Sequence, residues 1–161
     1  MKTKTKIWIY PLALMGILVV LVSGCKKDKS EPELSIGDSY GGGIIYDKQW
    51  REDNLMTYDG FYIYLIAATS DQSKSARYDT AVRICDQLVL NGYSDWFIPR
   101  PDDLNKMYAS RAAIGGFRKG YYWCFDFTGN DLKQCINFKD GQSHWCSKDS
   151  AFCVRAVRSS R

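Results

Sequence analysis

Two amphipathic segments flank a short aromatic run near the middle of the chain. In residues 80–90 the apolar side chains recur with the spacing of one helical face: Ala81, Ile84, Cys85, Leu88 and Val89. In residues 102–110 the expected buried stripe is Leu104, Met107 and Tyr108. Between them, Trp96-Phe97-Ile98 is aromatic and β-branched, and Pro99 and Pro101 stop it from continuing as a strand. The pattern predicts two helices joined by a buried connector.

The residues at the helix ends support this prediction. Asp79 or Thr80 can cap the first helix, because a short side-chain oxygen accepts free backbone N–H groups. Asn91-Gly92 ends the segment, since both residues tolerate positive φ. Asp102 and Asp103 lie in the first turn of the second helix, where negative charge is favourable. A helix start explains this pair better than a catalytic carboxylate pair does.

Apolar runs on both sides of the helices predict strands. Residues 61–68, FYIYLIAA, are almost continuously apolar, so we expect a central strand covered on both faces. Residues 50–59 are charged and irregular and predict a loop. Four further segments read as strands, the first after a tight glycine turn: residues 44–46, 121–127, 135–138 and 151–157. Strands at both ends with helices between them indicate an α+β domain.

The first 24 residues have the pattern of an export signal. Lys2, Lys4 and Lys6 precede an apolar run over residues 7–22, which is short for a membrane span. The run ends in Val22-Ser23-Gly24-Cys25, which resembles the lipobox of bacterial lipoproteins. The resemblance implies cleavage before Cys25 and lipid on its sulfur, and two or three acyl chains anchor a protein stably. An uncleaved N-terminal anchor is the alternative.

Residues 25–35 comprise the lipidated cysteine and a polar segment that reads as a flexible tether, and residues 36–159 form the predicted domain. The formal charge of +4 overstates the basic character of the mature protein. Removing the signal leaves 19 basic and 18 acidic side chains, a charge of +1. We therefore expect no nucleic-acid partner, because such proteins usually carry a basic stripe.

Five cysteines remain after Cys25: Cys85, Cys124, Cys135, Cys146 and Cys153. Export places them in an oxidising compartment, where disulfides form. Four of them allow three connectivities, and any of the five can be left over. A zinc site is the rival, but the sequence has no CxxC pair and His144 is its only histidine. We expect no metal and no cofactor.

Six sequence motifs together resemble the family of the C-terminal domain of the Legionella collagen-like adhesin. They are GGGIIY at 41–46, LIAA at 65–68, NGYSDW at 91–96 with Ile98-Pro99, DLN at 103–105, GYYW at 120–123 and VRAVR at 154–158. The resemblance implies a variant of the C-type lectin-like fold, with two helices on a small, mostly antiparallel sheet. It also implies the bridges Cys85–Cys153 and Cys135–Cys146, with Cys124 free. The calcium motifs of sugar-binding lectins are absent from the sequence.

The leading functional hypothesis is a lipid-anchored module of the bacterial outer membrane that binds a polysaccharide or a surface protein without catalysis. Whether it faces the periplasm or the cell surface is open. The resemblance places the ligand at two polar loops, residues 126–133 and 139–150. Their candidate ligand-binding residues are Asp126, Asn130, Asp131, Lys133, Lys139, Asp140, Gln142, His144 and Lys148. A sulfated ligand would use the lysines, whereas a neutral glycan would depend on aromatic side chains.

Two alternatives remain. One is a cysteine enzyme related to the formylglycine-generating oxidases, for which Cys124 is the spare thiol. Its apolar neighbours Trp123 and Phe125 instead predict an inert, buried side chain. The other is a purely structural envelope protein. For Arg155 and Arg158 we expect a structural ion pair or a solvated strand end rather than an anion site.

The first prediction concerns the lipid. Replacing Cys25→Ala should abolish incorporation of a labelled fatty acid and release the protein from membranes, because no sulfur remains to carry the lipid. A variant that loses the label but stays in the membrane fraction would support the uncleaved anchor instead.

Overall fold

The computed structural model describes residues 33–54 and 59–160. Within them the chain forms three helices and nine strands, ordered β1 (Ser39–Tyr40), β2 (Gly43–Asn54), β3 (Asp59–Ala67), β4 (Ser73–Ala76), α1 (Tyr78–Asp86), α2 (Pro101–Ala109), α3 (Arg111–Ile114), β5 (Tyr121–Trp123), β6 (Leu132–Asn137), β7 (Ser143–Ser147), β8 (Phe152–Val154) and β9 (Val157–Ser159). Strands thus precede and follow the helices, so the domain is α+β, as predicted.

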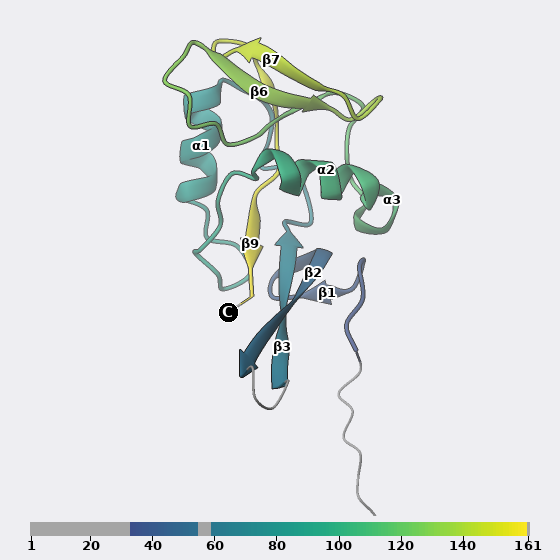
Figure 1. The fold of residues 1–161 in the computed structure, drawn as a ribbon. Helices are drawn as coiled ribbons and strands as arrows, with labels where there is room; N and C mark the ends of the chain where they lie inside the picture. The colour runs from purple at the N-terminus through teal and green to yellow at the C-terminus, as the bar shows by residue number, and fades with distance from the viewer. Residues whose placement is uncertain (1–32, 55–58, 161) are drawn as a thin grey trace, which may run out of the picture. The chain divides into compact units, whose positions relative to one another are not determined.

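The strands form two sheets. The first has the order β1-β2-β3-β9, with antiparallel neighbours throughout. The second has the order β4-β8-β5-β6-β7, in which only β5 and β8 are parallel. Figure 1 shows the β6–β7 hairpin at one end of the domain and the β2–β3 hairpin at the other, with the helices between them. The chain passes directly from β8 in the second sheet to β9 in the first.

The two helices lie close to where the sequence predicts them. Leu104 and Met107 of α2 are fully buried, as the apolar stripe requires. The helix α1 ends at Asp86, four residues before the predicted end. Its predicted cap is wrong: Arg77 occupies the N-cap position without a side-chain hydrogen bond, and Asp79 lies inside the first turn. Trp96 and Ile98 are buried in the connector, whereas Phe97 is 37% exposed.

Several predicted strands have different bounds in the structure. β5 ends at Trp123, although the apolar run continues to residue 127. The final predicted strand divides into β8 and β9. Three strands were missed: the two-residue strand β1, and β4 and the edge strand β7, whose sequences are polar. All but one of the β7 residues are exposed. A polar edge strand lacks the alternation on which sequence reading depends.

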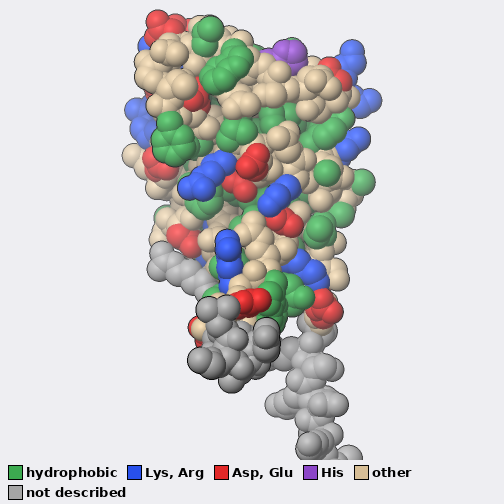
Figure 2. Space-filling view, in the orientation of Figure 1, with side chains coloured by type: hydrophobic (Ala, Val, Ile, Leu, Met, Phe, Trp, Pro, Cys, Tyr) green, Lys and Arg blue, Asp and Glu red, His purple; other side chains and the backbone are tan. Residues whose placement is uncertain are grey.

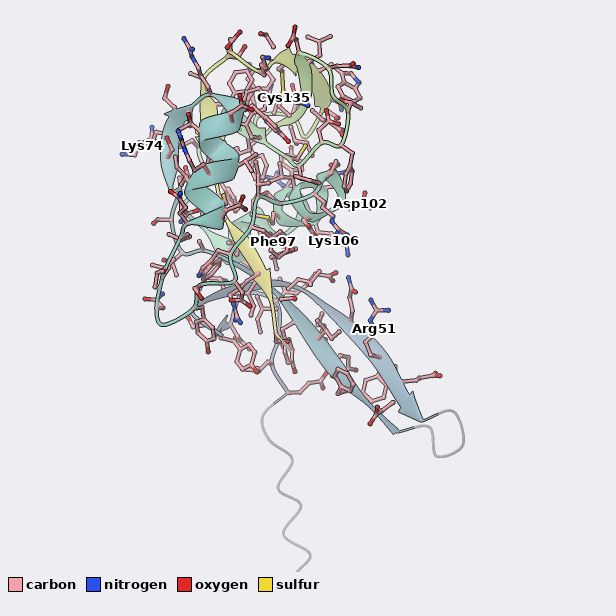
Figure 3. The ribbon with its side chains drawn as sticks, turned by 90° about the vertical axis from the view of Figure 1, so that its left-hand side faces the viewer. Arg51, Lys74, Phe97, Asp102, Lys106 and Cys135 are labelled. Atoms are coloured by element: carbon pink, nitrogen blue, oxygen red, sulfur yellow. A yellow bond between two sulfur atoms is a disulfide. The ribbon has the colours of Figure 1, made fainter. Side chains whose placement is uncertain are left out.

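The largest departure is the β2–β3 hairpin. β2 continues through Asn54, so the predicted loop is wrong for residues 50–54. β1 pairs only with Gly43 and Ile44 of this hairpin, and β9 pairs only with Leu65 to Ala67. The outer part of the hairpin is therefore two strands wide and projects from the domain (Figures 1 and 3), with Arg51 on the projecting part in Figure 3. Phe61 and Tyr62 are 49% and 38% exposed, so β3 is not covered on both faces.

A buried arginine joins three segments at the centre of the domain. The guanidinium of Arg155, fully buried between β8 and β9, donates to the Asp71 carboxylate at 2.7 Å and to the carbonyls of Ala68 and Gly116 at 3.0 and 2.8 Å. The Tyr122 hydroxyl donates to the other oxygen of Asp71 at 2.9 Å. The expected structural ion pair is confirmed, and it ties the segment after β3 and the segment after α3 to the β8–β9 junction.

We predict that Asp71→Ala lowers the free energy of unfolding by about 3–5 kcal/mol, because the Arg155 charge then stays buried without its carboxylate. Urea denaturation followed by circular dichroism measures the loss. As a control, Asp149→Ala removes the exposed partner of Arg77, 3.9 Å away, and should change the stability little. Equal losses in the two variants would contradict the assigned role of Arg155.

Candidate functional site

The predicted ligand-binding residues lie at opposite ends of the β6–β7 hairpin rather than in one site. Asp131 and Lys148 meet at one end, where the Lys148 ammonium lies 2.7 Å from the Asp131 carboxylate. Asp140 belongs to the turn between β6 and β7 at the other end. His144 lies on β7 itself, opposite Cys135, with its ring edge-on to Tyr121. Asn130 lies at the same end as Asp131, and Lys139 and Gln142 lie in the turn with Asp140.

Most polar groups of these residues already have partners within the fold. The Asp126 carboxylate accepts hydrogen bonds from the backbone N–H and the hydroxyl of Thr128. Lys133 is buried, donates to the Thr128 carbonyl and lies over the Tyr78 ring. Asp140 accepts the Gln142 N–H at 2.9 Å within its own turn. These contacts order the loops and leave few groups to hold a ligand.

Asp126 also lines a groove of about 350 Å³ beside the start of α2. Arg100, Phe125 and Phe127 line it as well. Phe127 is 85% exposed and packs edge-on against Phe125. Asp102, another lining residue, lies in the first turn of α2 and is labelled in Figure 3. The groove combines apolar rings with charges of both signs.

The cysteines confirm one expected bridge and contradict the other. Cys135 and Cys146 form a disulfide between β6 and β7, with their Cα atoms 6.5 Å apart. Cys85 and Cys153 are both free, so the expected Cys85–Cys153 bridge is wrong. Neighbouring strand residues face opposite sides of a sheet. Val154 faces the core that contains Cys85, and Cys153 therefore faces the other core.

Cys124 is free and buried, as expected. Burial raises the pKa of Cys85 and the pKa of Cys124 to about 12, and it raises the pKa of Cys153 as well. A thiol with such a pKa is almost entirely protonated at neutral pH, whereas the thiolate is the nucleophile.

In residues 33–54 and 59–160, no three His, Cys, Asp or Glu side chains are placed to hold a metal ion. Tyr122 and Trp123 are fully buried core residues.

A row of four neighbouring aromatic rings runs along the β2–β3 hairpin to β1. The rings of Trp50 and Tyr62 lie 5.0 Å apart, those of Tyr62 and Tyr64 6.3 Å, and those of Tyr64 and Tyr40 5.1 Å. Trp50 is 48%, Tyr40 40% and Tyr62 38% exposed, and Tyr64 is half-buried. We call these four residues the aromatic row.

The strand register explains how the aromatic row forms. Trp50 is directly opposite Tyr62, and Lys48 is directly opposite Tyr64. Side chains two residues apart on a strand share a face, so Tyr62 and Tyr64 line up along β3. Phe61 and Ile63 face the other side. The row was missed because residues 50–59 read as a loop: residues 47–54 are polar except for Trp50 and show no apolar–polar alternation.

Each cation beside the aromatic row is paired with a carboxylate. The Lys48 ammonium lies 2.5 Å from the Glu33 carboxylate and 5.0 Å from the centre of the Tyr62 ring. At the base of the hairpin, Arg158 makes a two-point ion pair with Asp95, at 2.7 and 3.1 Å, which confirms the structural role expected for Arg158. The surface of the row therefore carries little net charge.

The row ends at a hollow of about 290 Å³, lined by Tyr40, Gly41, Tyr93, Arg158 and Ser160. Tyr40 belongs to both the row and the hollow. Gly41 and Gly42 have φ values of +55° and +85° and form the tight turn that the sequence predicts. A Cβ atom at Gly41 would lie 2.7 Å from the Arg158 guanidinium, and one at Gly42 would lie 2.6 Å from the Tyr93 ring. Side chains at these positions would therefore collide with the residues that line the hollow.

Comparison with known proteins adds no functional assignment. No protein-family model matches the chain, and no curated protein matches it significantly. Of the helices in the described part of the chain, none is long and apolar enough to cross a membrane. Cys25 lies outside the described residues.

We predict that iodoacetamide at pH 8 modifies none of Cys85, Cys124 and Cys153 in the native protein, because burial keeps these thiols protonated and inaccessible. After unfolding without reduction, all three should react. Mass spectrometry of peptides prepared without reduction should recover Cys135 joined to Cys146. A recovered Cys85–Cys153 peptide would contradict the structure.

Proposed function

We propose that this protein is a lipid-anchored cell-envelope module that binds a neutral polysaccharide, without catalysis, through the aromatic row. The single observation that carries the proposal is the exposure of Trp50, Tyr62 and Tyr40 in a continuous line with Tyr64. Tryptophan and tyrosine each present a large apolar body with a polar tip. Sugar rings have apolar C–H faces and polar hydroxyl rims, so a row of such side chains suits a chain of sugars.

The position of the row supports a recognition role over a structural one. Soluble domains rarely leave large contiguous apolar surfaces exposed unless those surfaces bind something. The outer hairpin supports no other described element, because β1 and β9 pair only with its base. Four rings in contact hold one another in place, so a ligand would meet a surface that is already ordered.

Charge favours a neutral ligand over a sulfated one. Lys133 is buried and Lys148 is paired with Asp131, so two of the three lysines expected to attract a polyanion are already engaged. Beside the row, Lys48 and Arg158 have carboxylate partners. On the face shown in Figure 2, Lys and Arg side chains are interspersed with Asp and Glu rather than gathered in one patch. A strong polyanion site would need unpaired cations together.

The anchoring and the family remain part of this proposal. We place the lipid on Cys25 and the protein at the outer membrane, on the basis of the signal sequence and Val22-Ser23-Gly24-Cys25. A C-type lectin-like domain of the collagen-like adhesin type is supported by the α+β class and by the Cys135–Cys146 bridge. The missing Cys85–Cys153 bridge is a departure from that family.

The alternative of a cysteine enzyme has less support. Cys124 is buried among apolar side chains and has a raised pKa, so it lacks the activation that a nucleophile needs. A purely structural role does not explain why the rings of the aromatic row are exposed to solvent.

We predict that Trp50→Ala and Tyr62→Ala each weaken binding to a neutral polysaccharide on the order of tenfold, which corresponds to about 1.4 kcal/mol. The loss follows from the removal of a ring on which a sugar would stack. Affinity electrophoresis of the detergent-solubilised protein in gels containing dextran, mannan, xylan or mixed-linkage glucan measures retention. Raising the salt from 0.05 to about 0.5 M should change retention little, although salt at that level screens exposed charges strongly.

The matched control is Phe61→Ala, which removes an exposed ring from the same strand but from the opposite face of the hairpin. It should bind like the wild type. Absence of retention in all four neutral gels would refute the proposed function. Retention only by a sulfated polymer, with loss at high salt, would replace the neutral ligand with a polyanion.

A further inference from the structure

We infer that the hollow at the base of the hairpin receives the terminal sugar of the chain, so the module binds polysaccharide ends rather than internal segments. This inference rests on the proposed function, because it assigns a direction to the chain that lies on the aromatic row. Three observations carry it: the asymmetry of the row, the hydrogen-bonding groups of the hollow, and the size of the hollow.

The two ends of the aromatic row have different surroundings. Trp50 and Tyr62 lie on the outer part of the hairpin, beyond the positions that β1 and β9 reach. A polymer can leave the row there into solvent. At the other end, Tyr40 borders the hollow, where Tyr93 and the C-terminal residues Arg158 and Ser160 belong to the body of the domain. A chain that follows the row inward therefore meets the domain beyond Tyr40.

The hollow supplies a charged hydrogen-bond donor, the Arg158 guanidinium, whereas the side chains of the row offer only tyrosine hydroxyls and an indole N–H. A guanidinium has five N–H donors. In Arg158, Nε and Nη2 each donate to Asp95, and Nη1 donates to the Gly41 carbonyl. The remaining two N–H groups have no acceptor among the described residues, although the side chain is only 7% exposed. The Tyr93 ring stacks on this guanidinium at 3.8 Å and holds it in place.

The position of the hollow distinguishes a terminal sugar from an internal one. Each terminal sugar has a free hydroxyl at the position where an internal sugar has a glycosidic oxygen. The guanidinium can donate to either oxygen, but an internal sugar also carries the next sugar of the chain there, and that sugar would meet the body of the domain beyond Tyr40. Along the row, by contrast, Lys48 is already engaged with Glu33, so contacts there are mainly with ring faces.

The size of the hollow fits one sugar ring. Its volume of about 290 Å³ lies at the lower limit of pockets that enclose drug-sized ligands, about 300 Å³. The rings of Tyr40 and Tyr93, 40% and 37% exposed, give it aromatic walls. One sugar would form hydrogen bonds in the hollow while the next sugars stack on the row, so both sets of contacts would contribute to binding of the same chain.

The test varies the chain length of one ligand. The neutral polysaccharide that the electrophoresis panel retains best is partially hydrolysed and fractionated into preparations of different mean length. Titration calorimetry with the detergent-solubilised full-length protein then measures the binding sites per gram of polysaccharide. If ends are bound, sites per gram should rise about tenfold when the mean length falls tenfold. A constant number of sites per gram at every length would overturn the inference while leaving the proposed function intact.

A variant pair tests the hollow itself. Tyr93→Ala removes a wall of the hollow and the ring that holds Arg158, and it should weaken binding of the short fractions about tenfold or more. Phe97→Ala is the matched control, because it has the same 37% exposure in the same connector but lines a different groove. Equal binding by the two variants would count against the hollow. If no fraction of any length binds the wild type, the proposed function fails as well.

Discussion

The ion pair between Arg155 and Asp71 is the interaction on which the rest of the fold depends. Arg155 lies where the chain passes from the second sheet to the first, and its donors reach the segments that follow β3 and α3. A buried charge is tolerated only when it is paired and its remaining donors are satisfied. These demands fix the positions of three loops relative to one another. Phe117, stacked on the guanidinium at 4.3 Å, keeps water away from the pair.

Arg158 repeats this arrangement three residues later. It joins Asp95 in the connector after α1 to the carbonyl of Gly41 before β2. The base of the hairpin is therefore held by a paired arginine, whereas its outer part has no described element beside it. The aromatic row and the hollow both result from this division, because a fully covered β3 would have buried Tyr62 and Tyr64.

The sequence predicted those features that depend on local periodicity. The buried residues of α2 follow from apolar spacing, and the glycine turn before β2 follows from the freedom of Gly41 and Gly42 to adopt positive φ. The exposure of Tyr62 could not be predicted in this way, because it depends on how far β9, more than 90 residues away, extends along β3. Side chains along a strand alternate between the two faces of the sheet, so a shift of one residue in the register of β8 would turn Cys153 to the other face. The family resemblance identified the Cys135–Cys146 bridge, but it also implied a Cys85–Cys153 bridge, whereas both of these cysteines are free.

The outer hairpin also bears on how copies of this protein can associate with one another. Beyond Tyr64, whose backbone exchanges hydrogen bonds with Ser160, no described strand covers the edge of β3. Uncovered edges are templates for association between molecules, and proteins usually protect them with charges or bulges. β2 has both, with Lys48, Arg51 and Glu52 and two irregularities in its register. Residues 60–65 of β3 contain no charged side chain, so this edge is the one through which the domain would aggregate.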